Sequence, residues 1–285
     1  MISKEQFQSE IQLIIENAVR EDVGEGDHSS LACIPAGAIG KAQLLVKDTG
    51  IIAGVEFAHL VFSYIDPSLE VSCLIRDGEA VTYGDVVFYV SGSSRKILMA
   101  ERLVLNAMQR MSAIATKTHK YVKLLEGTHA KILDTRKTTP GIRALEKWAV
   151  KIGGGENHRF ALYDMIMLKD NHIDFAGGIT SAIQKTRAYL ETLGKPLKII
   201  VEARNLAEVE EILEAGGVNR ILLDNFSLED TRRAVGMAAG RCQTESSGGI
   251  TENTLRKYAE CGVDYISSGA LTHSVYNMDL SLKAL

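Results

Sequence analysis

The segment LKIIVEARNLAEVEEILEAGGVNRILLDNFSLEDTRRAVGMAAGRCQTESSGGITENTLRKYAECGVDYISSGA (197–270) decides the fold. Four short runs begin about every 22 residues within it, and a helical stretch separates each run from the next. One strand, two turns and a three-turn helix fill that length. Alternating strands and helices with right-handed crossovers build a parallel sheet. The regular spacing favours a closed (β/α) barrel over an open sheet, and no G-x-G-x-x-G follows the first strand to support a Rossmann fold.

Two earlier runs, AKILDTRK (130–137) and MIMLKDN (165–171), extend the barrel pattern towards the N-terminus. The residues before them read differently. Between about 39 and 90, β-rich runs and glycine turns surround one helical stretch, which indicates a small mixed α/β domain with a sheet partly covered by helices. Residues 1–22 have helical spacing, and the segment 97–127 is long enough for two helices with a break near Ser112–Ala113.

Composition excludes several classes of protein. The 285 residues are 46% hydrophobic and 24% charged, with four prolines, which is typical of a folded chain. A net charge of -4 argues against a general binder of nucleic acid or membrane surfaces. The charge is uneven, because residues 95–172 hold 15 Lys and Arg against 7 Asp and Glu. A basic middle in an acidic chain indicates one place that holds an anionic ligand, although two solvated helix faces would give the same balance.

The cysteines and the N-terminus bear on location. Cys33, Cys73, Cys242 and Cys261 show no C-x-x-C spacing and no nearby histidine cluster, so we expect free thiols and no zinc site. The N-terminal helix carries charges throughout, unlike a signal peptide, and no apolar run approaches the length that crosses a bilayer. We therefore expect a cytoplasmic protein.

The ends of the predicted strands carry the candidate chemistry, because functional side chains of a barrel lie at the C-terminal ends of its strands. Each run turns from its strand residues to ionic or small polar ones. Charges that merely mark the exit from strand to loop are the plain alternative, but six successive endings are hard to attribute to it. The positions are Arg136, Lys137, Lys169, Glu202, Asp224 and the Ser-Gly pairs of SSGGI (246–250) and SSGAL (267–271).

These residue types match an anionic, phosphorylated substrate. Glycine lets backbone N–H groups approach a phosphate, and a helix N-terminus adds free donors, so two Ser-Gly loops on late strands indicate a phosphate site. GGGENHRF (153–160) places His158 beside Arg159. His158 is a candidate acid or base, and we favour a donor to a carboxylate. Glu202 and Asp224 stand among cations, where they would accept hydrogen bonds from ribose hydroxyls and hold Mg²⁺ through water.

Several long motifs together resemble the quinolinate phosphoribosyltransferase family. ERLVLNAMQRMSAIAT (101–116) is similar to that family's interdomain helix, and EDVGEGDHSS (21–30) to its N-terminal signature. The remaining motifs follow in the family's order over nearly the whole chain. They are DTRKTTPGIR (134–143), KIGGGENHR (151–159), MLKDNH (167–172), LLDNF (222–226), SSGGI (246–250) and YISSGALTHS (265–274).

The resemblance implies a fold and an assembly. It implies an N-terminal α/β open-faced sandwich domain over 1–112, with the tail 275–285 packed on it. An incomplete, about seven-stranded α/β barrel would follow over 113–274. It implies a homodimer or larger assembly in which the N-terminal domain of one subunit caps the barrel of the other.

The resemblance also implies a reaction and its residues. Quinolinate and phosphoribosyl pyrophosphate (PRPP) would give nicotinate mononucleotide, pyrophosphate and CO₂, with Mg²⁺ and no organic cofactor, as a step of NAD biosynthesis. Lys137, Lys169, Glu202 and Asp224 would be catalytic, with Lys137 facing the pyrophosphate and the two acids meeting the ribose. The quinolinate carboxylates would contact Arg136, His158, Arg159, Lys169 and, from the neighbouring subunit, Arg102. The 5′-phosphate would contact Ser247, Gly248, Gly249, Ser268, Gly269 and Ala270.

Three departures and three alternatives remain. Ala113 stands where the family usually has glycine, IVEARN (200–205) keeps only Glu202 as an acid, and HSS replaces V-T-T near residue 30. The alternatives are a related phosphoribosyltransferase for another aromatic acid, a Schiff-base barrel lyase using Lys169, and a ligand-binding scaffold without activity. The intact DTRKTTPG and GGGENHR motifs favour the dicarboxylate, and the charged strand ends argue against a scaffold.

Overall fold

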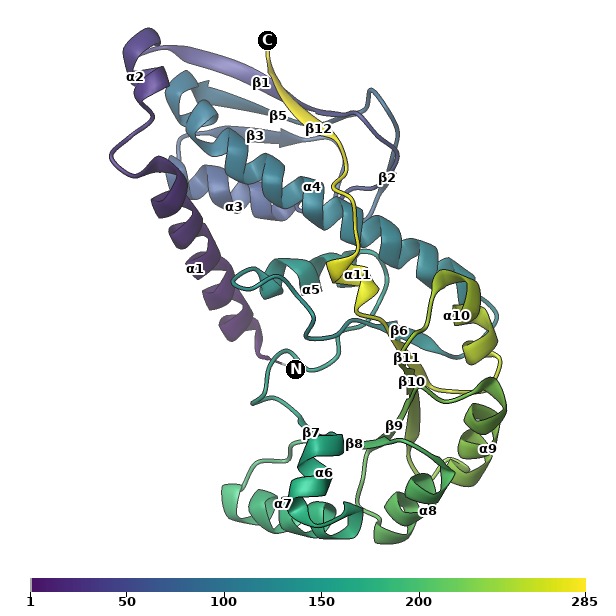
Figure 1. The fold of residues 1–285 in the computed structure, drawn as a ribbon. Helices are drawn as coiled ribbons and strands as arrows, with labels where there is room; N and C mark the ends of the chain where they lie inside the picture. The colour runs from purple at the N-terminus through teal and green to yellow at the C-terminus, as the bar shows by residue number, and fades with distance from the viewer. Residues whose placement is uncertain (1) are drawn as a thin grey trace. The chain divides into compact units, whose positions relative to one another are not determined.

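A computed structural model describes residues 2–285, and its contacts divide the chain into two compact units (Figure 1). The sheet unit comprises residues 3–119, 137–154 and 270–285, and the barrel unit comprises 120–136 and 155–269 together with Ile2. The predicted domain boundary at 112/113 stays a prediction. Within residues 2–285, no helix is both long enough and apolar enough to cross a bilayer.

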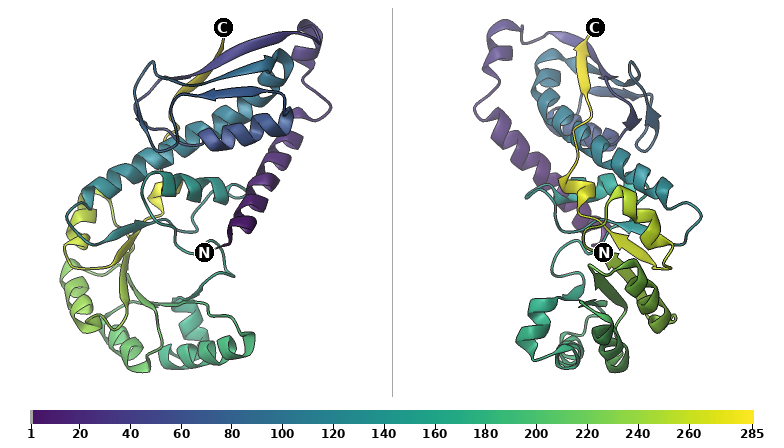
Figure 2. Two further views of the ribbon diagram at one scale, coloured as in Figure 1. Left: turned by 180° about the vertical axis from the view of Figure 1, so that it is seen from behind. Right: turned by 45° about the vertical axis from the view of Figure 1, so that its right-hand side comes forward.

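The sheet unit is built on an antiparallel sheet with the strand order β12-β1-β5-β3. Local sequence determines where its helices begin, as at α1, where Ser3 and Gln6 form a capping box at the N-terminus of the helix. Helices α3 and α4 cover one face of the sheet (Figures 1 and 2). The strands are β1 (Ile39–Val46), β3 (Glu70–Cys73), β5 (Val86–Ser93) and β12 (Leu280–Ala284), with β2 (Gly50–Ile51) and β4 (Ala80–Val81) as a separate pair. The helices are α1 (Lys4–Val23), α2 (His28–Cys33), α3 (Val55–Ile65), α4 (Ser94–Leu124), α5 (Arg143–Ile152) and α11 (Ala270–His273).

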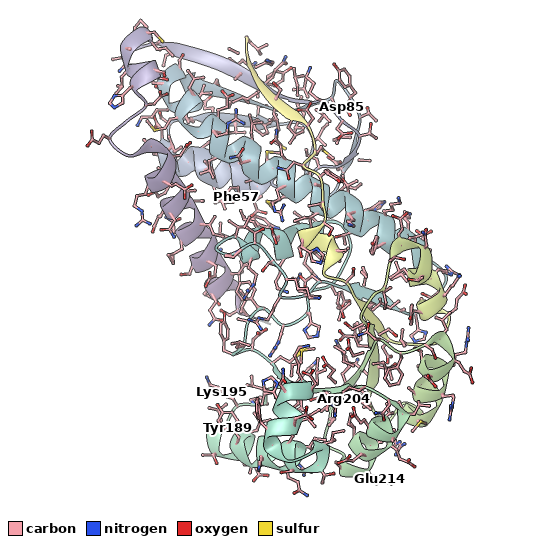
Figure 3. The ribbon with its side chains drawn as sticks, viewed as in Figure 1. Phe57, Asp85, Tyr189, Lys195, Arg204 and Glu214 are labelled. Carbon is pink, nitrogen blue, oxygen red and sulfur yellow. The ribbon has the colours of Figure 1, made fainter. Side chains whose placement is uncertain are left out.

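Alternation of apolar and polar residues fixes which face of this sheet is buried. Along β1, Ala42, Leu44 and Val46 are buried while the residues between them are partly exposed. Phe88 of β5 is fully buried and meets Phe62 of α3 edge to face, with 5.9 Å between ring centroids. Phe57 of α3 belongs to the same core (Figure 3). Burying these rings supplies much of the stabilisation of this unit.

The predicted break near Ser112–Ala113 is wrong, because α4 runs unbroken from Ser94 to Leu124. Ser112 is fully buried, and its hydroxyl bonds the backbone of Ala53 instead of competing for the backbone of its own helix. Alanine, leucine and methionine around it are strong helix formers. Because the Ser112 hydroxyl is hydrogen-bonded to Ala53, it does not compete for the backbone of α4, and the helix continues.

The barrel unit is built on a parallel sheet with the strand order β6-β11-β10-β9-β8-β7, which confirms the predicted α/β class. Helices α7 to α10 lie along one side of it (Figures 1 and 2). The strands are β6 (Lys131–Leu133), β7 (Ile166–Leu168), β8 (Ile199–Ala203), β9 (Arg220–Asp224), β10 (Gln243–Ser247) and β11 (Tyr265–Ser267). The helices are α6 (Asp170–Ala176), α7 (Ile179–Leu193), α8 (Leu206–Ala215), α9 (Leu228–Ala238) and α10 (Glu252–Ala259).

The seventh strand of the expected barrel is reduced to a single bridge. Leu133 of β6 pairs in parallel with Glu156, and the N–H of Glu156 donates to the Ile132 carbonyl at 2.9 Å. The bridge lies directly after three glycines, which favour turns over a continued strand. The hydrogen-bonded sheet of the described residues therefore ends at Glu156 on one side and at β7 on the other.

Candidate active site

The register of the parallel strands sets one chemistry-bearing face. Glu202 of β8 and Glu245 of β10 both pair with Leu222, and Asp224 of β9 pairs with Ser247 of β10. Paired residues of neighbouring strands point to the same side, and side chains alternate along each strand. Glu202, Asp224, Glu245 and Ser247 therefore share a face, opposite the face of Val201 and Leu223 that packs on helices.

A lysine and a carboxylate meet at the ends of β7 and β8. The Nζ atom of Lys169 donates to Oε2 of Glu202 at 2.8 Å. Glu202 is buried, whereas the Lys169 side chain is 46% exposed. The carboxylate of the pair therefore lies inside the sheet and the ammonium group lies near the surface. The backbone N–H of Lys169 donates to Nδ1 of His172 in the first turn of α6, which fixes where the strand ends. Two residues predicted for the site are thus in contact.

The loop after β9 explains the first Ser-Gly pair. Asn225 adopts a positive φ of 55°, its N–H donates to the Ser247 carbonyl, and its amide donates to Asp224. Gly248 has φ 88°, and a Cβ there would lie 2.3 Å from Oδ1 of Asn225. Both the backbone conformation and the approach of Asn225 thus require glycine at 248. The loop places Asp224 beside Ser247 and Gly248, three of the residues predicted to contact PRPP.

The second Ser-Gly pair is built differently. The backbone N–H of Ser268 donates to the carbonyl of Leu133, so this N–H is already engaged within the barrel unit. Gly269 ends the barrel unit, and Ala270 begins α11 in the sheet unit. The structure therefore brings Ser268 and Gly269 to the end of β11, while the contact of Ala270 with phosphate stays a prediction.

A buried acid anchors the GGGENHRF loop. Asp134, fully buried after β6, accepts from the backbone N–H of His158 at 2.8 Å and from the amide of Asn157 at 2.6 Å. Arg159 follows, and its Nη1 donates to the Met165 carbonyl at 3.2 Å. The loop is held by hydrogen bonds within the barrel unit, so its basic residues have defined positions.

Arg159 and Arg136 form a cationic pair of this unit. Burial lowers the pKa of the Arg159 guanidinium, and the nearby positive charge of Arg136 lowers it further, with Asp164 acting in the opposite sense. Arg159 is buried, whereas Arg136 is exposed, and an anion beside the two guanidinium groups would offset the repulsion between their charges. This is the property a carboxylate-binding site needs.

His158 is held more tightly than the sequence indicates. Its Nδ1 accepts the backbone N–H of Arg159 at 2.7 Å, and its Nε2 lies 3.4 Å from Oε2 of Glu245. Glu245 is fully buried and also accepts from Nη1 of Arg220 at 2.7 Å. Sequence reasoning missed Glu245 and Arg220. The available signal was weak: one acid in the polar strand QTESS, two residues before Ser247.

Three predicted site residues lie in the sheet unit. Arg102 is exposed on α4, Lys137 is exposed and its carbonyl accepts from the Thr272 hydroxyl, and Ala270 begins α11. Their predicted roles stay predictions. Among residues 2–285 there is no cluster of three or more His, Cys, Asp or Glu able to hold a metal ion.

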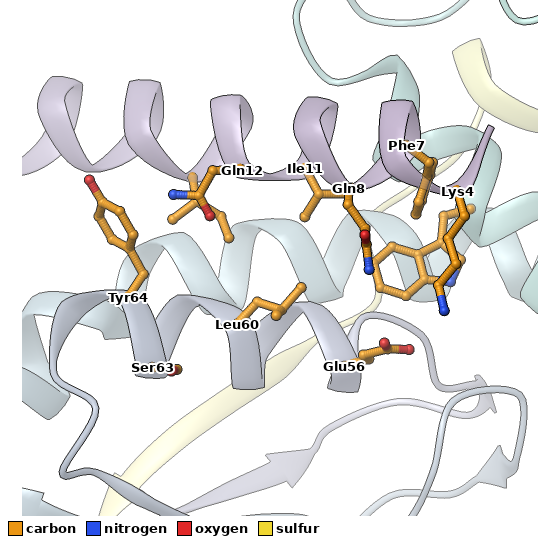
Figure 4. A pocket seen from close by; sticks show the side chains of 11 residues that line it. Lys4, Phe7, Gln8, Ile11, Gln12, Glu56, Leu60, Ser63 and Tyr64 are labelled. Atoms are coloured by element: carbon orange, nitrogen blue, oxygen red, sulfur yellow. The ribbon is translucent and has the colours of Figure 1, made fainter. Parts of the chain in front are cut away.

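A separate pocket lies between α1 and α3 of the sheet unit (Figure 4). It encloses about 540 Å³, and none of the predicted site residues lines it. Trp148 of α5 packs edge to face on Phe7 of α1 at its end. Its lining residues are Lys4, Phe7, Gln8, Ile11, Gln12, Ile15, Glu56, Leu60, Ser63, Tyr64 and Trp148. This pocket is therefore unrelated to the strand ends of the barrel.

A parallel α/β barrel whose strand ends gather cations, two carboxylates and a glycine loop defines an enzyme acting on anionic, phosphate-bearing substrates. A family model described as quinolinate phosphoribosyl transferase, C-terminal domain, matches residues 114–283, and the corresponding N-terminal domain matches 27–112. The chain belongs to the quinolinate phosphoribosyltransferase family. This confirms the predicted family and enzyme class over a Schiff-base lyase or a scaffold.

Individual relatives agree with the family match. The chain is 45% identical over 291 residues to the carboxylating nicotinate-nucleotide pyrophosphorylase, chloroplastic, of Arabidopsis thaliana, covering 96% of this chain and 82% of that protein. It is 44% identical over 286 residues to a decarboxylating quinolinate phosphoribosyltransferase of Nicotiana tabacum, covering 95% and 81%. A crystal structure of NadC from Streptococcus pyogenes matches with a TM-score of 0.90 and 39% identity, covering 100% of this chain and 99% of that one.

Proposed function

We propose that this chain transfers a phosphoribosyl group from PRPP to quinolinate, giving nicotinate mononucleotide, pyrophosphate and CO₂ in the biosynthesis of NAD. The observation that carries the proposal is the division of charge in the barrel unit. Glu202 and Asp224 share one face of neighbouring strands, with Lys169 on Glu202, while Arg136 and Arg159 form a cationic pair. A sugar centre that gains positive charge needs acids, and a dicarboxylate needs cations.

The cations would bind the pyridine dicarboxylate. Arg159, Arg136 and Lys169 offer donors that suit carboxylates, and guanidinium groups bind them in a two-pronged fashion. His158 would line the same site and hold the backbone N–H of Arg159, and Arg102 would reach in from a neighbouring subunit. Holding the ring nitrogen in line with the anomeric carbon lowers the barrier through orientation alone, by several kcal/mol.

The acids would act on the ribose. As the ring nitrogen attacks C1′, the bond from C1′ to the pyrophosphate oxygen breaks and the ribose gains positive charge. The carboxylates of Glu202 and Asp224 would accept hydrogen bonds from the ribose hydroxyls and stabilise that charge. Ser247, Gly248 and Gly249, with Ser268, Gly269 and Ala270, would bind the 5′-phosphate. Lys137 and Lys169 would face the departing pyrophosphate.

Loss of CO₂ follows from the product of this first step. The ring nitrogen is now quaternary, so the electrons of the bond to the adjacent carboxylate can pass into the ring as CO₂ leaves. A proton from solvent then replaces the carboxylate. The pyridinium itself is the electron sink, and the enzyme's contribution is to hold the ring and its remaining carboxylate.

The acidic residues fit a magnesium ion bound with the substrate. Two carboxylates, one already paired with Lys169, are too few to form a complete site, but Mg²⁺ commonly takes one or two carboxylates, several waters and substrate phosphate oxygens. Glu202 and Asp224 would hold the ion through water. When bound, it would neutralise negative charge on the pyrophosphate.

We also propose a homodimer or larger assembly with a shared active site, and a cytoplasmic location. The support for the assembly is the exposure of Arg102 on α4, where a second subunit could use it. Sedimentation of the purified protein would test the assembly. A monomer with full activity would contradict the shared site.

The direct test of the reaction mixes purified protein with quinolinate, PRPP and Mg²⁺ and follows nicotinate mononucleotide by chromatography. We expect one equivalent of labelled CO₂ for each nucleotide from quinolinate labelled in the carboxylate next to nitrogen. Nicotinate and other aromatic acids serve as matched substrates. Faster turnover of one of these would instead support the related phosphoribosyltransferase.

A further inference from the structure

A buried ion pair joins β9 and β10 of the barrel unit, and Glu245 is level with Glu202 because both pair with Leu222. Glu245 stands in the middle of β10, and Arg220 begins β9. Nη1 of Arg220 donates to Oε2 of Glu245 at 2.7 Å, and its guanidinium stacks on the ring of Tyr265 at 3.8 Å from the centroid. Burial raises the pKa of Glu245, but contact with His158 and Arg220 outweighs it and lowers the pKa to about 2. Glu245 is therefore a carboxylate at neutral pH.

This pair is costly to bury, and its presence calls for a reason. Replacing a buried ion pair by apolar residues of similar volume often leaves a protein as stable or more stable. The pair does not stand alone, because Oε2 of Glu245 also lies 3.4 Å from Nε2 of His158. One carboxylate oxygen thus faces both a strand cation and the imidazole of the GGGENHRF loop.

The other side of the imidazole determines its tautomer. Nδ1 of His158 accepts the backbone N–H of Arg159 at 2.7 Å. A ring nitrogen that accepts a hydrogen bond carries no proton, so the proton of His158 is on Nε2, the atom that faces Glu245. Glu245 faces the ring directly, and Arg220 is paired with Glu245. The other charged groups near the ring are Asp134, which accepts from the His158 backbone N–H, Arg159, and Arg136, whose charge acts on Arg159.

The loop is therefore fastened at two levels. Asp134 holds its backbone at His158 and the side chain of Asn157. Glu245 faces the His158 ring, and the ring in turn accepts the N–H of Arg159. Removing Glu245 would leave the backbone anchor but free the ring to turn. Arg159 would keep the hydrogen bond from its Nη1 to the Met165 carbonyl but lose a fixed ring behind its backbone N–H.

We propose that Glu245 is a positioning residue of the active site, which holds His158 as its Nε2–H tautomer and thereby orients Arg159 towards the substrate dicarboxylate. Arg220 neutralises the carboxylate of Glu245, which faces Nε2 of His158 at 3.4 Å. The kinetic part of this inference rests on the proposed function, since it takes Arg159 as a ligand of quinolinate. The tautomer does not depend on it.

Nuclear magnetic resonance of the histidine side chains tests the tautomer without substrate. The His158 ring signals of nitrogen-labelled enzyme are assigned by their loss in His158→Asn. At neutral pH we expect one protonated nitrogen, Nε2, and one unprotonated nitrogen, Nδ1. In the charge-balanced double variant Glu245→Leu/Arg220→Leu we expect averaged signals of both tautomers. An Nδ1–H ring or a doubly protonated ring in the unmodified enzyme would overturn the inference.

Kinetics test the positioning role. Glu245→Leu/Arg220→Leu should raise KM for quinolinate about tenfold, with kcat and KM for PRPP changed less than about twofold. The conservative double variant Glu245→Gln/Arg220→Gln keeps an oxygen that accepts from Nε2–H, and should recover most of the loss. Equal loss in both variants, a parallel loss of kcat and both KM values, or an unchanged KM for quinolinate would overturn the role. Failure of the proposed function itself is distinct, because the unmodified enzyme would then form no nucleotide.

Discussion

The two sheets of this chain bury different chemistry. In the sheet unit, β1 alternates buried apolar residues with partly exposed ones, whereas β8 of the barrel unit buries all five of its residues, Glu202 included. Buried charged residues follow the same division. The sheet unit has Glu146 and Lys147, and the barrel unit has Asp134, Arg159, Glu202, Arg220 and Glu245. Because a buried charge destabilises a fold unless it is paired, the barrel gives up stability where its chemistry requires charge.

The largest effect should come from the apolar sheet. Phe88→Ala removes a fully buried ring that meets Phe62, and we expect the free energy of unfolding of the sheet unit to fall by about 3–5 kcal/mol. Denaturant unfolding followed by fluorescence measures it. The KM values of the enzyme that stays folded should be unchanged. A change in KM without loss of stability would break the comparison between the two sheets.

The next effect should come from the acid at the end of β9. Asp224→Asn keeps shape and removes charge, and we expect kcat to fall about 100- to 1000-fold, since one electrostatic group at a developing charge contributes that much. KM for quinolinate should change little. Asp230 in the first turn of α9, half-buried and paired with Arg233, gives a matched control, Asp230→Asn, with kcat near that of the unmodified enzyme. Unchanged turnover in Asp224→Asn would remove its catalytic role.

A smaller effect should separate the two substrates. Arg136→Ala removes one member of the cationic pair, and KM for quinolinate should rise about 10- to 100-fold, the loss expected for charged hydrogen bonds. KM for PRPP should stay nearly constant in steady-state assays. Arg204, labelled in Figure 3, also follows a barrel strand but forms an ion pair with Glu208. Arg204→Ala is therefore the control and should have no effect on either KM. An equal rise in both KM values would count against the assignment.

The smallest effect should distinguish two glycines with positive φ. Gly248→Ala meets Asn225 as well as backbone strain, whereas Gly84→Ala in the sheet unit meets open space. We expect both to lose about 1–3 kcal/mol of stability from strain. Only Gly248→Ala should also raise KM for PRPP, by about tenfold. If the two variants bind PRPP equally well, the loop after β10 does not contact the phosphate.

Most of the barrel could be predicted because its strands recur at a fixed spacing and end in polar residues. The continuity of α4 through Ser112 could not be predicted, since the partner of the Ser112 hydroxyl, Ala53, lies 59 residues away. The seventh strand is a single bridge at Glu156, which leaves no pattern of its own.

The site could be predicted where a residue type follows a strand, as with Lys169, Glu202 and Asp224. The role of Glu245 was not predicted, because a single acid in a polar strand has the pattern of a solvent-exposed residue. Its meaning comes from His158 and Arg220, which are 87 and 25 residues away in the chain and which only the fold brings to it.

The position of β12 has a consequence for synthesis. Residues 280–284 pair with β1, so the eight-residue β1 is the edge of its sheet until the five-residue β12 has been made and takes that place. Exposed strand edges attract other chains. Products that lack these five residues would therefore present the longer strand β1 as the edge of the sheet, which favours pairing with other chains.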